Sequence, residues 1–450
     1  MGIGAILLLL PVPSGLTEKG MMVLITTIVA TTLFITEPVP LPTVALLIIA
    51  SQILLLEIPS SQVARSLMND SVLFIMGSLM LAVAVVKQKL DKRIALMIIS
   101  VTGTKTIRIS FGITVISGLL ASFIGEHTVA AMMLPVGITL ITLTSDDPKK
   151  VRNLAALLLF SIAYGCSVAG IGTPSGGARN AIMIGYWSEF SGIHIDYIRW
   201  MFYAYPLFLL QLPIVTLILY FSFKPEVVDL AEPVEKLREQ VARQGTLKGK
   251  DWVAIIFFFL ILIGWVTLSG EWGMGTIAIL GAASFLVAGL VNWEDLNSGV
   301  NWGVVLLYAA AISLGVQMKD TGAAQWVAES FLAALKPLGA DSGIGLKLSI
   351  SALTAGVTNT MSNGAAVAVL GPIILPMAKM ANESEIISGF ITAVSSAFAY
   401  LTVVGTPACT IVYASGYLKT TDFLKVGWKM VIISTAILMG FASYVWPLME

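Results

Sequence analysis

Two ionisable residues, Glu126 and His127, lie inside the long apolar stretch 109–143. An unpaired charge within hydrocarbon is costly, so intramembrane ionisable residues usually have a function. An imidazolium can hold an anion or replace a bound cation, and a carboxylate can orient it or pair with a base such as Arg179. The alternative is that Glu126 and His127 form a structural pair that satisfies its own charges and has no further role. The pair at 126–127 is therefore the first candidate site.

The elements around this pair are long and apolar. Of the 450 residues, 57% are hydrophobic and 12% are charged, whereas soluble domains carry about 25% charged residues. Runs such as 252–268, 274–291 and 428–445 approach the length that crosses about 30 Å of hydrocarbon. The composition predicts an all-α polytopic membrane protein. A net charge of zero, without basic patches, indicates no nucleic-acid partner.

The positions of the cations predict an orientation. Basic residues gather within 87–108, 149–152 and 224–250, and such clusters usually stay in the cytoplasm. The stretch 109–143 is too long for one span, and it begins and ends beside cytoplasmic clusters. We therefore expect a re-entrant hairpin over 107–145 that turns near Gly125, because irregular backbone at membrane depth must be buried in protein or line a cavity.

The second half repeats this plan with little cationic excess, which places its hairpin on the outer face. The expected hairpin covers 343–381 and turns within 359–364, and the short segments 94–101 and 323–335 precede the two hairpins as interfacial helices. Each hairpin is followed by a helix broken at Gly-Thr-Pro, over 151–187 and 386–417. Proline beside glycine predicts an unwound section there.

The two halves align across their hairpin tips, with 125–135 over 362–372. We expect inverted repeats at 1–223 and 251–450, joined by a cytoplasmic linker at 224–250. Inverted repeats are typical of secondary transporters, whose substrate site lies at the repeat interface. Helix ends at the breaks present free N–H groups to an anion and carbonyls to a cation.

Three segments carry a family resemblance: 34–43 (FITEPVPLPT), 89–96 (KLDKRIAL) and the Gly405-Thr406-Pro407 break with 411–413 and 416–418. They resemble the divalent anion:sodium symporter (DASS) family, the INDY-type carboxylate transporters. The resemblance implies a homodimer in which a transport domain moves like an elevator against a scaffold domain. It also implies a dicarboxylate, tricarboxylate or sulfate substrate, and a Ser-Asn-Thr triplet at each hairpin tip that contacts the substrate and borders sodium.

The second triplet is present as Ser362-Asn363-Gly364, and Thr358, Asn363 and Gly405 would form a residual sodium site under this resemblance. The first is replaced by Gly125-Glu126-His127, so the sequence leaves the need for sodium open. We expect His127 or Arg179 to supply the charge in place of sodium, which gives a sodium-independent exchanger. The alternative is a sodium-coupled symporter of dicarboxylates, tricarboxylates or sulfate.

The expected substrate is a four- or five-carbon dicarboxylate of the succinate, malate or 2-oxoglutarate type. Its two carboxylates would bridge the tips, and charge-assisted hydrogen bonds at both ends would measure its length. Arg179 could contact it or extend to the interface instead. The predicted substrate-binding residues are Glu126, His127, Thr128, Thr173, Pro174, Ser362, Asn363, Gly364, Thr406 and Pro407.

Other classes of function fit less well. The sequence has no G-x-S-x-G or H-E-x-x-H motif for an intramembrane enzyme, and the glycines of 170–177 follow no strand, which argues against a nucleotide. A channel would need charged positions across the bilayer, whereas these cluster at one tip. We expect no cofactor and no certain metal, and a multi-pass plasma-membrane location with an extracellular C-terminus. The apolar segment 1–10 would be a shortened first membrane helix.

Overall fold

The computed structural model describes residues 11–88, 102–145, 147–242 and 249–450. Within these residues the chain is helical, and its one strand-like pairing is an isolated bridge between Lys105 and Asp229. Ten of the described helices are long and apolar enough to cross a membrane. The prediction of an all-α polytopic membrane protein is confirmed. The predicted helices at 1–10 and 94–101, the whole of the 89–96 motif and part of the 224–250 linker lie outside the described residues.

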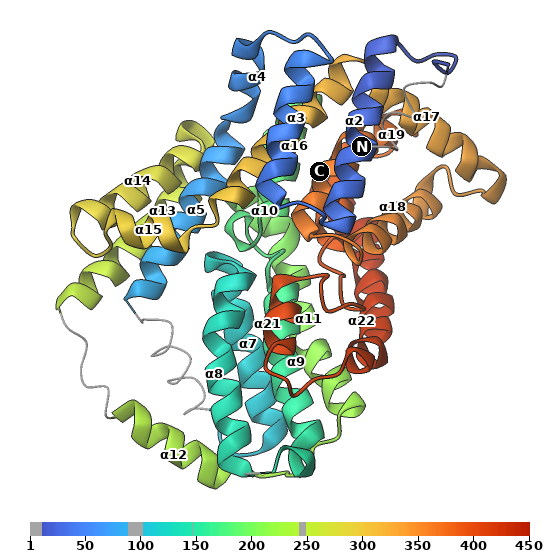
Figure 1. Cartoon of the computed structure of the whole chain (residues 1–450). Helices are drawn as coiled ribbons and strands as arrows, with labels where there is room; N and C mark the ends of the chain where they lie inside the picture. Colours follow the sequence, from blue (N-terminus) through green and yellow to red (C-terminus); the bar gives the residue numbers. More distant parts are fainter. Residues whose placement is uncertain (1–10, 89–101, 146, 243–248) are drawn as a thin grey trace.

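One set of helices comes from the first part of each half of the chain and occupies the upper part of Figure 1. Helix α17 (Ala323–Leu335) has the bounds predicted for the second interfacial segment, 323–335. The set consists of α2 (Glu18–Thr36), α3 (Leu41–Leu54), α4 (Ser60–Leu67), α5 (Asp70–Lys87), α13 (Gly249–Trp272), α14 (Met274–Val287), α15 (Trp293–Gly299), α16 (Trp302–Asp320) and α17 (Ala323–Leu335).

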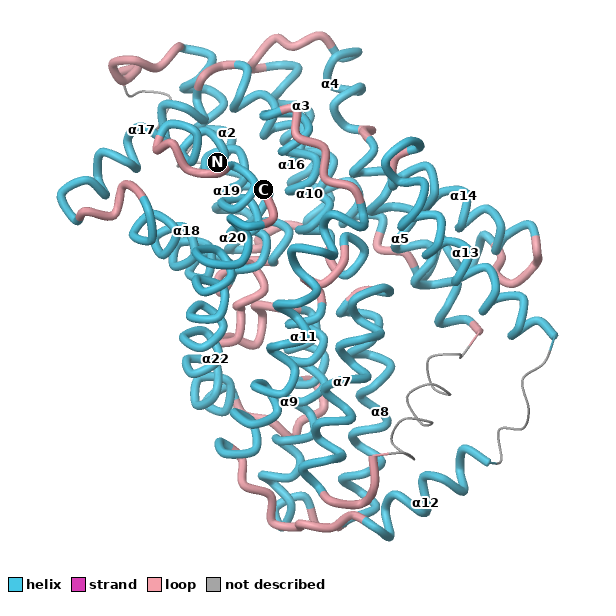
Figure 2. Tube along the Cα trace, turned by 180° about the vertical axis from the view of Figure 1, so that it is seen from behind, coloured by secondary structure: helices cyan, strands magenta, loops and turns pink. Residues whose placement is uncertain are grey.

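The remaining helices build the two hairpins, the two broken helices and the long helices that flank them. In both views α7, α8, α9 and α11 run side by side, with α12 below them (Figures 1 and 2). The set consists of α7 (Thr106–Ile124), α8 (Glu126–Thr144), α9 (Arg152–Ala169), α10 (Ala178–Tyr186), α11 (Tyr197–Ser222), α12 (Ala231–Ala242), α18 (Gly343–Thr358), α19 (Asn363–Met380), α20 (Glu385–Ser395), α21 (Pro407–Tyr413) and α22 (Thr420–Gly440).

The two hairpins turn in different ways. Helices α7 and α8 are joined by Gly125 alone, whose φ of 87° lies in the region that favours glycine. Helices α18 and α19 are joined by four residues, 359–362, and Ser362 caps α19 by accepting the Ala365 N–H at 3.4 Å. The second tip is therefore the broader of the two.

The two predicted breaks separate α9 from α10 and α20 from α21. The first contains a short 3-10 turn, Pro174–Gly176, and the second is an irregular stretch from 396 to 406. Thr406 caps α21 by accepting the Cys409 N–H at 3.1 Å, and Pro407 takes the first helical position, where its missing N–H costs nothing. Helix α9 is buried all round from Leu154 to Ala169, as its uniform apolarity requires.

An aromatic cluster joins the C-terminal end of the chain to this framework. The Phe390 ring lies 4.7 Å from that of Tyr203 and 5.5 Å from that of Trp446, centroid to centroid. The indole N–H of Trp446 donates to the Tyr203 carbonyl at 2.9 Å. Helices α11 and α20 and the end of the chain are thus packed around one apolar centre.

Candidate functional site

The first hairpin tip meets the first helix break through a buried ion pair. Glu126 begins α8 and Arg179 lies in the first turn of α10. Arg179 Nη1 is 3.1 Å from Glu126 Oε1, and the two side chains are 1% and 10% exposed. The pairing of Glu126 with Arg179 that the sequence suggested is present. Two charges that would each be costly alone in hydrocarbon neutralise one another here.

The second hairpin tip contacts the same carboxylate. Asn363, the first residue of α19, donates from Nδ2 to Glu126 Oε1 at 3.3 Å. These two residues are 237 positions apart and are the ones that the alignment of the two halves superposes. Both begin their helices, so the N-termini of α8 and α19, with their partial positive charges, approach one another at this point.

Several polar atoms of this centre have no partner among the described residues. They are Glu126 Oε2, Arg179 Nε and Arg179 Nη2, all buried. A buried donor or acceptor without a hydrogen bond is costly, and native structures contain few of them. The free Nε and Nη2 form one edge of the guanidinium, which is suited to receive a carboxylate with two parallel hydrogen bonds.

Glycines of the first break make room for the guanidinium. A Cβ at Gly170 would lie 2.4 Å from Arg179 Nη2, and a Cβ at Gly177 would lie 3.1 Å from Nη1. Any larger residue at 170 would push the arginine away from Glu126. The glycine-rich segment thus has a steric role, in addition to the unwinding expected from its sequence.

Hydrogen bonds made by its polar residues stabilise the first break. The Thr173 hydroxyl donates to the Ser122 carbonyl of α7, and Asn180 Nδ2 donates to the carbonyls of Gly170 and Thr173, both at 2.7 Å. Pro174 opens the short turn that follows and is buried. The hydrogen bonds of Thr173 and Asn180 thus tie the break to itself and to the hairpin.

Three oxygen atoms converge behind the second tip. Thr358 Oγ1 lies 2.9 Å from Asn363 Oδ1 and 2.7 Å from the Ser396 carbonyl oxygen. The hydroxyl has one hydrogen for these two acceptors. Oxygen ligands of this kind suit a hard cation, and they include two of the three predicted sodium-site residues. The third, Gly405, lies against Ala399.

The second break contacts the first. Ser167 of α9 donates to Thr406 Oγ1 at 3.3 Å, which joins the two broken helices close to their interruptions. Thr406 is fully buried, whereas Pro407 is exposed. Of the two residues predicted here, Thr406 therefore has a place in the protein interior and Pro407 lies on its surface.

His127 differs from its neighbour. Its side chain is exposed, and none of the hydrogen bonds among the described residues includes it. Thr128, the next residue, is half-buried. In its predicted role as a cation, His127 would thus act from the exposed side of the tip. The Glu126 side chain, in contrast, points inward to Arg179.

Tyr308 is a site residue that the sequence did not reveal. Its phenol packs against Gly364, where an added Cβ would lie 2.4 Å from the hydroxyl oxygen. Tyr308 lies in α16, an ordinary apolar span whose sequence contains no signal for this contact. Ser362 and Gly364 thus form a tip that is closed on one side by an aromatic ring.

Comparisons with known proteins agree with this architecture. A family model described as the sodium:sulfate symporter transmembrane region matches residues 1–450. A sodium-dependent dicarboxylate transporter, SdcS, from Staphylococcus saprophyticus is 26% identical over 98% of this chain and 89% of its own. SdcS from Staphylococcus aureus is also 26% identical, over 97% of this chain and 88% of its own.

Two solved structures share the fold at low identity. The YdaH transporter of Alcanivorax borkumensis has a TM-score of 0.58 at 13% identity, over 96% of this chain and 100% of its own. MtrF of Neisseria gonorrhoeae has a TM-score of 0.60 at 12% identity, over 96% of each chain. The family resemblance drawn from the sequence is confirmed by the family model. Because that model matches the whole chain, the protein belongs to the sodium:sulfate symporter family, that is, the DASS family of membrane transporters.

Proposed function

We propose that the protein carries dicarboxylate anions across the membrane and binds them between its two hairpin tips. The observation that carries this proposal is the buried Arg179, whose Nε and Nη2 have no hydrogen-bond partner among the described residues, while its Nη1 pairs with Glu126. A guanidinium held in place by one carboxylate can bind a second one bidentately. The SdcS relatives, which are sodium-dependent dicarboxylate transporters, support this substrate class.

The proposed binding mode uses both tips. One substrate carboxylate would take the free edge of Arg179, and the other would take N–H groups at the start of α19 beside Ser362 and Gly364. His127 and Thr128 would line the open side of the first tip. A substrate with a single carboxylate would leave one of these two groups of donors unpaired, so four- and five-carbon dicarboxylates would be preferred over monocarboxylates.

The proposed transport cycle follows the architecture expected from the sequence. Inverted repeats at 1–223 and 251–450, with the linker 224–250, would form a scaffold domain and a transport domain in each protomer of a homodimer. The hairpins and broken helices would move together as the elevator. The contacts Glu126–Asn363 and Ser167–Thr406 support this unit, because they link the two hairpin tips and the two breaks.

For the coupling, we infer exchange without sodium. Glu126 and Arg179 cancel one another, so a protonated His127 would give the first tip a net charge of +1, the charge of one sodium ion. An unneutralised cation would oppose the return of the empty carrier through the barrier, which favours obligatory exchange. The exposed side chain of His127, which forms no hydrogen bond with another described residue, supports this proposal.

Sodium-coupled symport is the second candidate. The convergence of Thr358 Oγ1, Asn363 Oδ1 and the Ser396 carbonyl supports it, since these oxygens could bind a small hard cation. The names of the SdcS relatives favour it as well. Under this candidate, Glu126 and Arg179 are a structural pair and the second tip couples transport to sodium.

Reconstituted transport distinguishes the two. We would measure uptake of labelled succinate into proteoliposomes, with sodium or choline as the cation, and with vesicles that are empty or preloaded with unlabelled 2-oxoglutarate. Exchange predicts uptake that needs internal dicarboxylate and ignores sodium. Uptake into empty vesicles that requires a sodium gradient would establish symport, and no uptake in any arm would contradict the dicarboxylate assignment.

The role of His127 has a matched control. His127→Ala should abolish most exchange, and His127→Lys should retain it, because the lysine restores a cation. His194→Ala is the control, since His194 is also exposed but lies in the loop before α11. Unchanged exchange rates in His127→Ala would contradict the substitute-cation proposal.

A further inference from the structure

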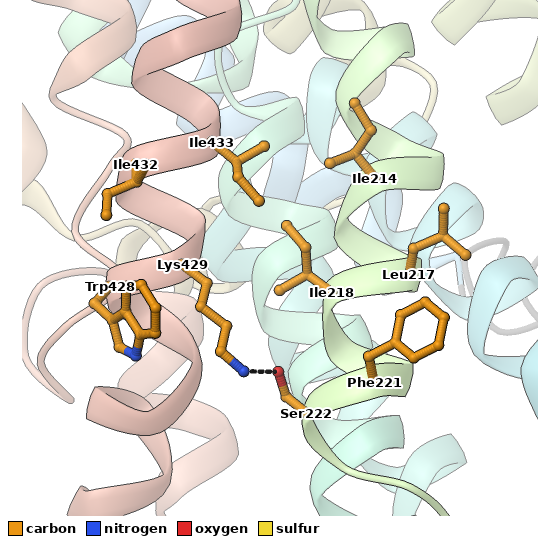
Figure 3. Close-up of a pocket in the computed structure, with 9 residues that line it drawn as sticks. All are labelled: Ile214, Leu217, Ile218, Phe221, Ser222, Trp428, Lys429, Ile432 and Ile433. Carbon is orange, nitrogen blue, oxygen red and sulfur yellow. Dashed lines mark hydrogen bonds between the residues drawn. The ribbon is translucent and has the colours of Figure 1, made fainter.

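An apolar groove lies between α11 and α22, away from the hairpin tips. Its volume is about 440 Å³. Several of its side chains are open on the outer surface of the protein, with Phe221 79% and Ile432 59% exposed. Figure 3 shows the apolar side chains of the two helices on either side of one lysine; they include Ile214, Leu217, Ile218, Phe221, Trp428 and Ile432.

Lys429 places a cation in this apolar groove. Its ammonium donates to the Ser222 hydroxyl at 2.9 Å (Figure 3), which uses one of its three donors. None of the ion pairs formed among the described residues includes Lys429. The ammonium also lies 5.9 Å from the centroid of the Trp428 ring. Both of these partners are neutral, so no carboxylate among the described residues balances its charge.

The acids at the adjoining ends of these two helices, Asp422 and Glu226, are engaged elsewhere. Asp422, in the first turn of α22, pairs with Arg152 at 3.2 Å. Glu226 follows the end of α11, and its carboxylate accepts the N–H groups of Asn153 and Leu154 at 2.8 and 2.9 Å. Both carboxylates hold the start of α9 in place. The positive charge of the groove is therefore available to an anion from outside the protein.

A second lysine lies one helical turn from the first. Lys425 Nζ is 4.7 Å from the centroid of the Phe223 ring, at the end of α11, and the Lys425 side chain is exposed. Residues four apart lie about 6 Å apart along a helix. The groove thus has an apolar length and a basic end, where two lysines of α22 meet the last residues of α11.

The position of the groove in the membrane follows from the spans. Both α11 and α22 are among the helices that can cross a membrane. The basic end at Ser222 leads directly into the cation-rich segment 224–250, which the sequence places in the cytoplasm. The apolar length therefore lies at the depth of acyl chains, and the lysines lie near the cytoplasmic headgroups.

We propose that this groove is a binding site for one anionic phospholipid of the cytoplasmic leaflet. The phosphate binds Lys429 and Lys425 by charge-assisted hydrogen bonds, and an acyl chain lies along Leu217, Ile218 and Ile432. A zwitterionic phospholipid carries its own cation, so its headgroup neutralises the lysines less well. An anionic headgroup supplies the charge that the groove lacks.

Native mass spectrometry of the purified full-length protein tests the proposal, with phosphatidylglycerol and phosphatidylcholine as probes. We expect tighter binding of phosphatidylglycerol, by about tenfold, and a loss of about tenfold in Lys429→Gln, as expected for one charge-assisted contact. Lys429→Arg should keep the affinity. Lys336→Gln is the matched control, because it removes one exposed lysine far along the chain, after α17.

Specific outcomes would overturn the proposal. Equal binding of the two lipids would show that the groove does not select anionic headgroups, and unchanged binding in Lys429→Gln would place the lipid elsewhere. Competition by inorganic phosphate without lipid retention would mean a free-anion site. If the wild type bound no lipid and Lys429→Gln dissociated a dimer, the groove would instead be an interface with a second copy of the chain. Equal melting temperatures of Lys429→Gln and Lys429→Arg would exclude unfolding as the cause of a lost affinity.

Discussion

At the scale of single residues, Arg179 organises the candidate site. It neutralises Glu126, fills the space left by Gly170 and Gly177, and has no hydrogen-bond partner for Nε and Nη2 among the described residues. A buried pair of this kind adds little net stability relative to apolar residues of the same size, but removing one partner leaves an uncompensated charge. The pair should therefore respond differently to single and double substitutions.

The first prediction concerns this pair. Arg179→Gln should destabilise the protein by roughly 3–5 kcal/mol, because the Glu126 carboxylate would remain buried without its counter-charge. Adding Glu126→Gln should restore much of the stability but not transport, since the carboxylate-binding edge would still be missing. Thermal unfolding in detergent and uptake into proteoliposomes measure the two effects. A double variant that is no more stable than Arg179→Gln would contradict the electrostatic explanation.

The second prediction concerns the space for the guanidinium. Gly170→Ala should lower stability by about 1–3 kcal/mol, the usual cost of overpacking, because the new Cβ would lie 2.4 Å from Nη2 of Arg179, whose Nη1 is ion-paired with Glu126. Dicarboxylate uptake should fall with it. Gly356→Ala in α18 is the control, because its Cβ would meet nothing within 4 Å. Equal melting temperatures for the two variants would show that Arg179 can shift without cost.

At the scale of elements, hydrogen bonds attach the second hairpin tip to the second helix break. Asn359, in the second tip, donates to the Phe398 carbonyl at 3.1 Å and accepts the Leu401 N–H at 3.0 Å. Thr402 donates to the Asn359 carbonyl at 3.0 Å. The irregular stretch between α20 and α21 is thereby attached to the hairpin, so the tip and the break form one unit.

The third prediction follows from that attachment. Asn359→Ala removes the acceptor of the Leu401 N–H, which is partly buried, and should weaken the local structure by about 1 kcal/mol, the net contribution of a typical hydrogen bond. Hydrogen exchange measured by mass spectrometry should accelerate over 396–406 and remain unchanged over α7 and α8. Acceleration spread evenly over the chain would indicate general destabilisation and contradict the local attachment.

At the scale of the whole molecule, labelling of introduced cysteines can test the predicted orientation of the protein in the membrane. Both native cysteines, Cys166 and Cys409, are buried, so they should contribute little background. In intact cells, a membrane-impermeant maleimide should label Lys336→Cys, whereas Lys149→Cys should react only after permeabilisation; both lysines are exposed. Glu450→Cys should behave like Lys336→Cys. Labelling of the 149 and 336 positions from the same side would contradict hairpins on opposite faces.

Much of the architecture could be predicted because the membrane imposes simple rules. Apolar length gave the spans, and glycine and proline marked the hairpin turns and the two breaks. The pairing of Glu126 with Arg179 was also within reach, since charges inside apolar stretches must find partners. These inferences depend on local sequence and on the cost of unpaired groups, and both can be read along the chain.

Other features depend on tertiary contacts and could not be predicted. Successive residues of a helix point about 100° apart, and nothing in the sequence says that Glu126 turns inward and His127 outward. The contact of Tyr308 with Gly364 and the bond from Thr173 to Ser122 depend on how distant helices approach one another. The sequence also does not say that Thr406 is buried while Pro407, the next residue, is exposed; the predicted substrate contact of both stays a prediction.

The single-glycine turn of the first hairpin has a mechanical consequence. Gly125 joins two helices of 19 residues each, and an added Cβ there would meet no atom within 4 Å. A helix of that length is a rigid arm of about 28 Å. A rotation of about 6° about the glycine would move the far end of α8 by about 3 Å. Any rotation about this turn would therefore be magnified along α8, from Glu126 to Thr144.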